Sequence, residues 1–391
     1  METPSSTDCR TEPGIRELRE AIPTHCFQPS YVRSFSYLAR DLLIIATLAL
    51  AALQYIPVIA NPWHRALAWT LYGFLQGLCG TGLFVLGHEC GHGAFSPSPR
   101  ANDAVGWVVH SALFTPFFTW RSLHKQHHLY TNNLQKDYNY IPLHRETFAA
   151  NLGICPEAIE ELTADAPIVT LFRIIVHQTF GWLVYMTGCL RLTLRNMGRP
   201  RRTWRWWREN AVRALLALHS HWDIWTIVAS DIGLGLTTSG LWYLAKSVGF
   251  STMFFLYIVP CLWVNHWYIV AITYLHHIHP DVPKYDQSDW TFLKGSLGTV
   301  DRDFGVIGRF FFHNIIDYHV VHHLFPQIPF YHAKEATDAI IPLIGDNYIN
   351  DREKSYLGGL WQAFTDCEWI EPAQGGQALR YKRRPVMHRK T

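Results

Sequence analysis

The sequence predicts an all-α integral membrane protein with four transmembrane helices and a cytosolic helical cap that holds metal ions. Three observations predict this fold class. Four apolar runs approach the length of about 20 residues that a spanning helix needs. Histidines recur at helical spacing beside these runs. The cations lie mostly in the same segments as the histidines, which places the clusters on one side of the membrane.

The four candidate spans form two hairpins, at residues 42–60, 66–87, 224–244 and 254–275. The connectors within the hairpins contain few cations, whereas the long middle segment and the C-terminal tail contain many. The positive-inside rule therefore predicts that both termini and every histidine cluster lie in the cytosol. Asp231, inside the third span, should face the protein interior because a carboxylate that faces lipid is costly.

Two further apolar segments are expected to lie at the membrane interface. Residues 105–118 are too few to span, and residues 168–190 include the polar Arg173 and Gln178. The chain is thus divided into a cytosolic arm, a membrane domain with its cap and a basic tail, at residues 1–35, 36–372 and 373–391. A formal net charge of +3 is too small to indicate a nucleic-acid partner. The 8 cysteines form no CxxC pair, so they suggest neither a disulfide framework nor paired thiolate ligands.

The clustered histidines predict more than one metal ion. Imidazoles at positions i, i+3 and i+4 share one face of a helix, and this spacing occurs twice. A further pair stands at i, i+4. The residues concerned are His88, His92, His124, His127, His128, His319, His322 and His323. Because zinc usually takes four ligands, these imidazoles are too many for one ion.

The identity of the metal separates three hypotheses. Iron with open coordination positions can activate dioxygen, whereas zinc has no redox chemistry. His88, Glu89 and His92 also match the H-E-x-x-H pattern of an intramembrane zinc protease, with the glutamate as general base. However, Gly91 and Gly93 are unfavourable in a stable helix, and a protease leaves the other clusters unexplained. The third hypothesis is a non-catalytic metal-binding or transport protein.

The motifs resemble those of membrane-bound acyl-lipid fatty-acid desaturases of the omega-6 (delta-12, oleate) type. Three histidine boxes carry the resemblance, at residues 88–96, 124–128 and 319–325. Four flanking runs extend it, at residues 271–280, 298–305, 312–315 and 331–336. The resemblance covers residues from about 30 to about 372, which is nearly the whole chain.

The resemblance implies two iron ions, with dioxygen as co-substrate, under a cap over a long acyl channel. It carries over the eight box histidines as iron ligands. His277 is the positional match for a ninth ligand, with His276 and His279 as the alternatives. Glu89 is expected to act at the centre by orienting a metal-bound imidazole. Further candidates for that role are Asp137, Asp301 and Asp317.

The resemblance also implies a reaction, its partners and a location. The expected reaction introduces a cis double bond into a monounsaturated C18 acyl chain, as in the conversion of oleate to linoleate. Near the boxes, residues such as Lys136 and Gly93 differ from those usual in the family. Acetylenase, conjugase, hydroxylase and epoxygenase activities are therefore alternatives. The substrate is expected to be an acyl lipid in the endoplasmic reticulum membrane. The sequence contains no haem-binding His-Pro-Gly-Gly segment, so a separate cytochrome b5 or similar donor is expected to supply electrons.

Overall fold

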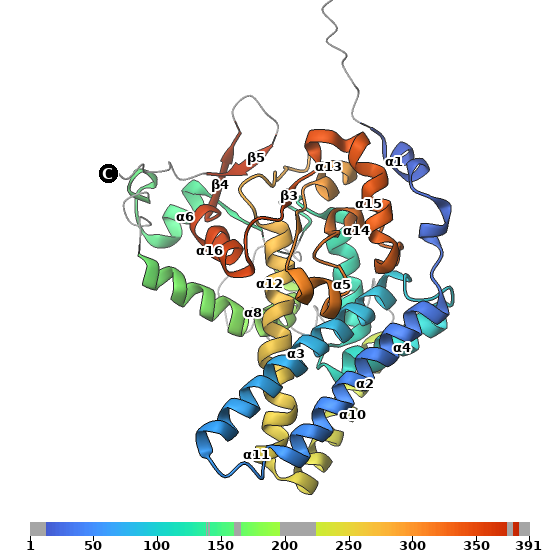
Figure 1. The fold of residues 1–391 in the computed structure, drawn as a ribbon. Coiled ribbons are helices and arrows are strands. Elements are labelled where there is room, and N and C mark those ends of the chain that lie inside the picture. Colours follow the sequence, from blue (N-terminus) through green and yellow to red (C-terminus); the bar gives the residue numbers. More distant parts are fainter. Residues whose placement is uncertain are drawn as a thin grey trace, which may run out of the picture.

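Long helices form a pillar at one end of the molecule and short helices gather in a cap at the other, as the computed structural model shows (Figure 1). The structure describes residues 13–373 and 378–382 except 138, 140, 160–165 and 196–223. The first residues of the predicted arm, the cation-rich stretch 196–223 and most of the predicted basic tail lie outside the described residues. The cytosolic location of these cations therefore stays a prediction from the sequence.

The helices are α1 (Ile15–Ala21), η1 (Thr24–Phe27), α2 (Tyr31–Tyr55), α3 (Pro62–His92), α4 (Pro99–Ala112), α5 (Phe117–Tyr130), α6 (Arg145–Leu152), η2 (Pro156–Ala158), α8 (Pro167–Arg195), α10 (Ile224–Val248), α11 (Phe250–Met253), η3 (Phe254–Asn265), α12 (His266–His277), α13 (Phe292–Leu297), η4 (Ile307–Phe311), α14 (His319–Leu324), α15 (Phe330–Ile344), η5 (Gly345–Asn347) and α16 (Tyr356–Asp366). The strands are β1 (Leu143–His144), β2 (Asp301–Arg302), β3 (Asn350–Asp351), β4 (Trp369–Pro372) and β5 (Leu379–Tyr381).

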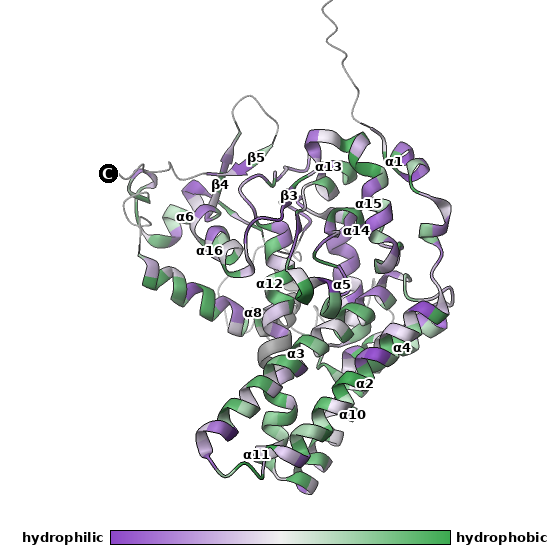
Figure 2. Ribbon diagram, viewed as in Figure 1, coloured by the Kyte–Doolittle hydropathy of each residue, from purple (hydrophilic) through white to green (hydrophobic). Residues whose placement is uncertain are grey.

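The pillar contains the helices that are suited to a bilayer. In the part of the chain that the structure describes, 3 helical segments are long and apolar enough to cross a membrane, at Tyr31–Tyr55, Pro62–His92 and Phe250–His277. They match the first, second and fourth predicted spans, although each is longer than predicted. Figure 2 shows mainly hydrophobic residues along this pillar and a mixture of polar and apolar residues in the cap. The boundary predicted between residues 35 and 36 falls inside α2.

The third predicted span is present as a helix, but it is not among those three segments. It is α10, which has 25 residues and lies beside the pillar (Figure 1). The expectation that Asp231 faces the interior is wrong, because its side chain is exposed. The register of α10 explains this. Ser230 is buried and accepts a hydrogen bond from the backbone N–H of Phe118 at 3.1 Å, so the next residue along the helix points outward.

The two predicted interfacial segments differ from each other in the structure. Residues 105–118 do not form one element, because a turn ends α4 at Ala112 and α5 begins at Phe117. Residues 168–190 lie in the single helix α8. This helix exposes apolar side chains such as Ile168 and Phe172 on one side and packs against α12 and α16 on the other. That distribution suits a helix that lies on a membrane surface.

The fold is mostly helical, as predicted, and two small sheets add to the helices. Strands β1, β4 and β5 form one sheet, and β2 pairs with β3 in parallel in the other. Strands as short as these are difficult to predict because they contain too few residues to show alternation. The β2–β3 pair joins Asp301 to Asn350 and ties the segment before α14 to the segment after α15. The fold is therefore mainly helical, with strands confined to the cap.

Glycines allow the first two histidine boxes to approach each other. A Cβ atom at Gly87 would lie 2.2 Å from Cδ2 of His110, and one at Gly106 would lie 2.3 Å from the ring of Phe117. The same added Cβ at Gly106 would lie 3.0 Å from Cβ of Cys90, which is inside the first box. Helices α3, α4 and α5 therefore pack closely where α3 ends and α5 begins.

We predict that Gly106→Ala lowers the melting temperature of the detergent-purified protein. The added methyl group overlaps Phe117, and overpacking of this kind costs about 1–3 kcal/mol. Gly235→Ala is the control, because it lies in α10 and a Cβ there meets nothing within 4 Å. Thermal unfolding measures both variants. Equal melting temperatures for Gly106→Ala and the wild type would show that α4 can shift without cost.

Candidate metal centre

The first histidine box lies at the C-terminal end of a helix. His88 and His92 occupy the last turn of α3, and Gly93 ends the helix with φ of 74°. That left-handed conformation favours glycine, and the backbone N–H of Ala94 donates to the carbonyl of Glu89. The glycines of the box are therefore compatible with a helix, because they stand at its terminus.

The second and third boxes divide their imidazoles between two clusters. Residues four apart on a helix differ by about 40° around the axis, whereas residues three apart differ by about 60° in the opposite sense. In α5, His124 and His128 join one cluster and His127 joins the other. In α14 the division is reversed, because His322 joins the first cluster and His323 the second. Both α5 and α14 therefore contribute imidazoles to both clusters.

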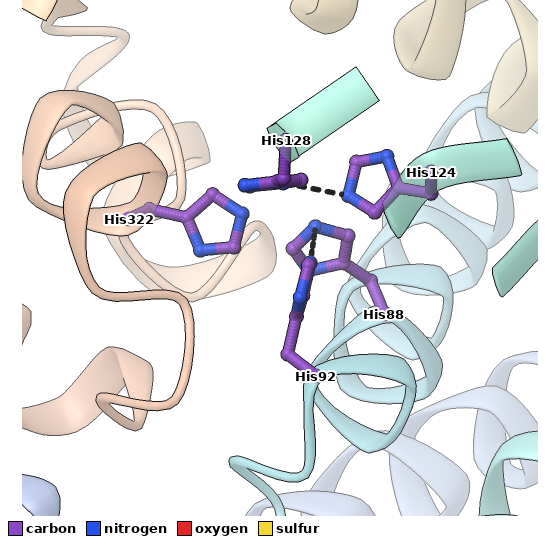
Figure 3. Close-up of side chains that lie close together, drawn as sticks. All are labelled: His88, His92, His124, His128 and His322. Atoms are coloured by element: carbon purple, nitrogen blue, oxygen red, sulfur yellow. Dashed lines mark hydrogen bonds between the residues drawn. The ribbon is translucent and has the colours of Figure 1, made fainter. Parts of the chain in front are cut away.

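The first cluster contains five imidazoles that point toward a common centre (Figure 3). Its members are His88, His92, His124, His128 and His322, whose ligand atoms lie within 4.8 Å of one another. Nε2 of His88 is 3.3 Å from Nε2 of His92, and the Nε2 atoms of His124 and His128 are 3.0 Å apart. Metal–nitrogen bonds of about 2 Å place neighbouring ligand atoms at about this separation.

The second cluster lies beside the first and is buried. It contains His127, His277 and His323 within 4.8 Å of one another. His319 adjoins it, with Nε2 at 3.3 Å from Nε2 of His277, and Nε2 of His127 is 3.1 Å from the same atom. The rings of His128 and His323 stack at 4.1 Å between centroids and connect the two clusters. All nine predicted metal-binding histidines are thus brought together.

Five of the clustered imidazoles favour the neutral form that metal ligation requires. Burial, followed by the neighbouring imidazoles, holds the pKa of each of these histidines well below its usual range: His124, His128, His319, His322 and His323. A neutral imidazole has a free lone pair for a metal. Among the described residues, the ring nitrogens Nε2 of His322 and Nε2 of His323 are buried without a hydrogen-bond partner. Donor type, spacing and unsatisfied nitrogens all fit bound metal ions.

Asp137 orients one imidazole of the second cluster. Its Oδ1 accepts a hydrogen bond from Nδ1 of His127 at 2.9 Å, which directs Nε2 toward His277. The carboxylate is fixed in turn by the backbone N–H groups of Asn132 and Asn139, each at 3.0 Å. A carboxylate behind a ligating imidazole fixes its tautomer and increases its basicity.

The other predicted carboxylates have different positions. Glu89 is buried, and its Oε2 accepts the backbone N–H of Phe330 at 3.0 Å while Oε1 lies 3.7 Å from Nδ1 of His88. Glu89 therefore connects the first box to α15 and does not belong to either cluster. Asp301 accepts the backbone N–H of Val320 at 2.8 Å and so caps α14. Asp317 lies 3.8 Å from the exposed Arg309.

The structure distinguishes His277 from its two neighbours. His276 contacts the carbonyl of Val300, and Nε2 of His279 lies 3.4 Å from the carboxylate of Asp351. Neither belongs to the second cluster, whereas His277 does. The candidate ninth ligand thus lies at the C-terminal end of α12.

Two buried cations, which sequence reasoning missed, hold that end of α12. Nζ of Lys284 donates to the carbonyl of His277 at 3.0 Å, and Nε of Arg302 donates to the carbonyl of Leu275 at 3.1 Å. Cations interact favourably with the last carbonyls of a helix. Arg302 is paired with Asp351 at 3.0 Å. Their contacts could not be found in the sequence, because Lys284 lies in a loop and Arg302 in the two-residue strand β2, both outside the histidine boxes.

An apolar cavity reaches both clusters. Its walls include Phe84 of α3, Trp182 of α8 and Val270 of α12. It is also lined by imidazoles of the first and second clusters, namely His88, His124, His127, His277, His319 and His323. A Cβ atom at Gly181 would lie 3.0 Å from Val270, so α8 and α12 approach closely along this wall. The cavity can place an apolar chain beside the imidazole clusters.

Comparison with known proteins identifies the family. Residues 60–355 match the family described as fatty acid desaturase. The chain belongs to this family. It is 40% identical to an oleate hydroxylase of Claviceps purpurea over 93% of this chain and 78% of that protein. It is 37% identical to a delta(12) fatty acid desaturase of Mortierella alpina, over 91% of this chain and 88% of that protein. It is 36% identical to an endoplasmic reticulum omega-6 fatty acid desaturase of Brassica juncea, over 94% of this chain and 91% of that protein.

These comparisons confirm the resemblance to the omega-6 group and the prediction of an oxidoreductase of the fatty-acid desaturase class. They displace the zinc-protease hypothesis, in which Glu89 would act as a general base. The position of Glu89 also argues against a general base, since one of its carboxylate oxygens already accepts a hydrogen bond from the backbone N–H of Phe330. The hypothesis of a non-catalytic metal-binding protein is displaced in the same way.

We predict that Asp137→Asn lowers the metal affinity of the second cluster by about 10- to 100-fold, the usual cost of losing a carboxylate behind a ligating imidazole. Iron content after dialysis against a chelator measures the effect. Asp346→Asn is the control, because this carboxylate is exposed. If both variants retain iron as the wild type does, Asp137 has no role in holding His127 for a metal.

Proposed function

We propose that this protein is a dioxygen-dependent di-iron desaturase that introduces a cis double bond into a monounsaturated C18 acyl chain. The observation that carries the proposal is the pair of adjacent imidazole clusters lining one apolar cavity. The delta(12) desaturases among the relatives support the choice of substrate. The reaction removes a hydrogen pair from neighbouring methylenes, and dioxygen with two added electrons and two protons is reduced to water.

The proposed iron ligands are the nine clustered histidines: His88, His92, His124, His127, His128, His277, His319, His322 and His323. Two iron ions held there supply the redox chemistry that activates dioxygen for attack on an unactivated methylene. Glu89 acts beside His88 as a positioning residue, since its carboxylate lies 3.7 Å from Nδ1 of that ring, an ion-pair distance without a hydrogen bond. Asp137 positions His127 through a direct hydrogen bond.

The protein's own groups bind and orient the acyl chain. The side chains of Phe84, Trp182 and Val270 provide apolar walls that exclude water and favour an extended hydrocarbon. The position of the chain along these walls decides which carbons face the imidazole clusters. Regiochemistry is therefore set by the cavity, not by the clusters.

The proposal includes a membrane arrangement. The helix α10 serves as a fourth span beside the three candidate spans, and the cap with its imidazole clusters lies on the cytosolic side of the endoplasmic reticulum membrane. One relative is named as an endoplasmic reticulum enzyme. The proposed domain is residues 36–372, between a cytosolic arm (residues 1–35) and a basic tail (residues 373–391). A separate cytochrome b5 or similar donor supplies electrons at the cytosolic face.

Hydroxylation is the second candidate function. The observation that favours it is the 40% identity to an oleate hydroxylase. Both reactions consume dioxygen and two electrons and begin at the same kind of methylene. They differ in whether an oxygen atom is added to the carbon or a second hydrogen is removed from its neighbour. Acetylenase, conjugase and epoxygenase activities use related chemistry and are further alternatives.

Expression in a host whose lipids contain oleate but no dienoic acid tests the proposed function. We expect a dienoic C18 acid in the lipid profile, identified by loss of a hydrogen pair from oleate. Gain of an oxygen atom would identify the hydroxylase instead. An inactive control is His127→Ala, because His127 lies in the second cluster and its loss removes a proposed ligand. A profile unchanged by the wild-type protein would contradict both functions.

The ninth ligand has its own test. We predict that His277→Ala lowers bound iron and abolishes the product, because this imidazole approaches both His127 and His319. His276→Gln is the matched control, since His276 contacts the carbonyl of Val300 and lies outside the cluster. Iron content and lipid products are measured for both. Iron loss in His276→Gln with iron retention in His277→Ala would show that His276, and not His277, is the ninth ligand.

A further inference from the structure

A third group of metal-binding side chains lies away from the imidazole clusters, where the N-terminal segment contacts α15. Its members are His25 and Cys26 of η1 with His332 and Glu335 of α15. Their candidate ligand atoms all lie within 4.8 Å of one another. The two pairs of residues come from segments far apart in the sequence, and none of the four belongs to a histidine box.

The distances suit a tetrahedral ion. Nε2 of His25 is 2.9 Å from Oε2 of Glu335 and 3.8 Å from Sγ of Cys26, and Nδ1 of His332 is 3.8 Å from the same glutamate oxygen. Zinc bonds of about 2.0–2.3 Å in a tetrahedron separate neighbouring ligand atoms by about 3.3–3.8 Å. The two 3.8 Å separations lie at the upper end of this range, and the 2.9 Å separation of His25 and Glu335 would have to widen for both groups to bind one ion.

We propose that His25, Cys26, His332 and Glu335 form a structural zinc site that joins the N-terminal segment to the cap. Thiolate, imidazole and carboxylate are all zinc ligands, and four protein ligands close the coordination shell of a structural site. The set differs from the all-imidazole clusters, which contain no thiolate within their described members. The inference does not depend on the proposed function.

The groups around the site are compatible with this assignment. Cys26 is buried, and burial together with the Glu335 carboxylate raises the pKa of its thiol to about 11, so zinc must displace the proton from this sulfur. Nη1 of Arg33 lies 3.3 Å from Nε2 of His332. If His332 binds the ion through Nδ1, its Nε2 carries a hydrogen and can no longer accept one from Arg33. The Arg33 side chain is exposed and has room to turn away.

The position of the site gives it a structural role. Leu18, Ile22 and Cys26 pack in one apolar cluster with Val320 and Leu324 of α14, the helix that carries the third histidine box. An ion bound by η1 and α15 would hold the N-terminal segment against this cluster. Zinc would therefore stabilise the cap behind the imidazole clusters without taking part in the reaction.

Cobalt is the probe for the site, because a thiolate ligand gives cobalt a charge-transfer absorption that imidazoles and carboxylates do not give. We expect this absorption when cobalt is added to the detergent-purified, iron-loaded full-length protein, and we expect zinc to remove it. Cys26→Ser should abolish it. Glu335→Gln should weaken cobalt binding at least tenfold. Asp338→Asn is the control, since it removes an exposed carboxylate of the same helix that pairs with Lys334 instead.

A second measurement covers the possibility that a variant folds poorly. Added zinc should raise the melting temperature of the wild type and of Asp338→Asn but not that of Glu335→Gln, whose substituted residue is half exposed. Absence of the thiolate absorption from the wild type, or its persistence in Cys26→Ser, would overturn the proposal. Iron content and lipid products of the same variants report separately on the proposed function, and Glu335→Gln should leave both unchanged.

Discussion

The close packing of nine imidazoles constrains how the helices of the cap can be arranged. Ring nitrogens separated by 3.0–3.3 Å would repel one another strongly if the rings were protonated in this buried place. Burial favours the neutral form, and the neutral form is what permits further burial. Helix ends are suited to such crowding, because side chains from several helices can converge there. The arrangement of the cap follows from the need to bring those ends together.

Surrounding groups hold the helix ends in place. Lys284 and Arg302 contact the final carbonyls of α12, and Asp301 caps α14. Glu89 connects the end of α3 to the start of α15. These interactions use charged or polar groups that are buried and fully engaged, so loss of one partner would leave another unsatisfied. The imidazole clusters are therefore positioned by a polar network, whereas the cavity beside them is apolar.

The sequence predicted the features that repeat along a helix. Imidazole spacing identified eight of the nine clustered histidines, the family resemblance added His277, and apolar runs identified three segments long enough to cross a bilayer. It did not predict which imidazole joins which cluster, because that depends on how α5 and α14 are rotated about their axes. Nor did it predict that Asp231 is exposed, since the register of α10 follows from the contact of Ser230 with Phe118. Buried cations and short strands arise from tertiary contacts that no local pattern records.

The division of each H-x-x-H-H box between two clusters couples them mechanically. His124 and His127 belong to one rigid helix but face different clusters, as do His322 and His323. A rotation or slide of α5 therefore displaces donor atoms in both places at once, and α14 has the same effect. Movement of α3 or α12, by contrast, displaces donor atoms of one cluster alone. The walls of the apolar cavity can change without moving donor atoms of either cluster.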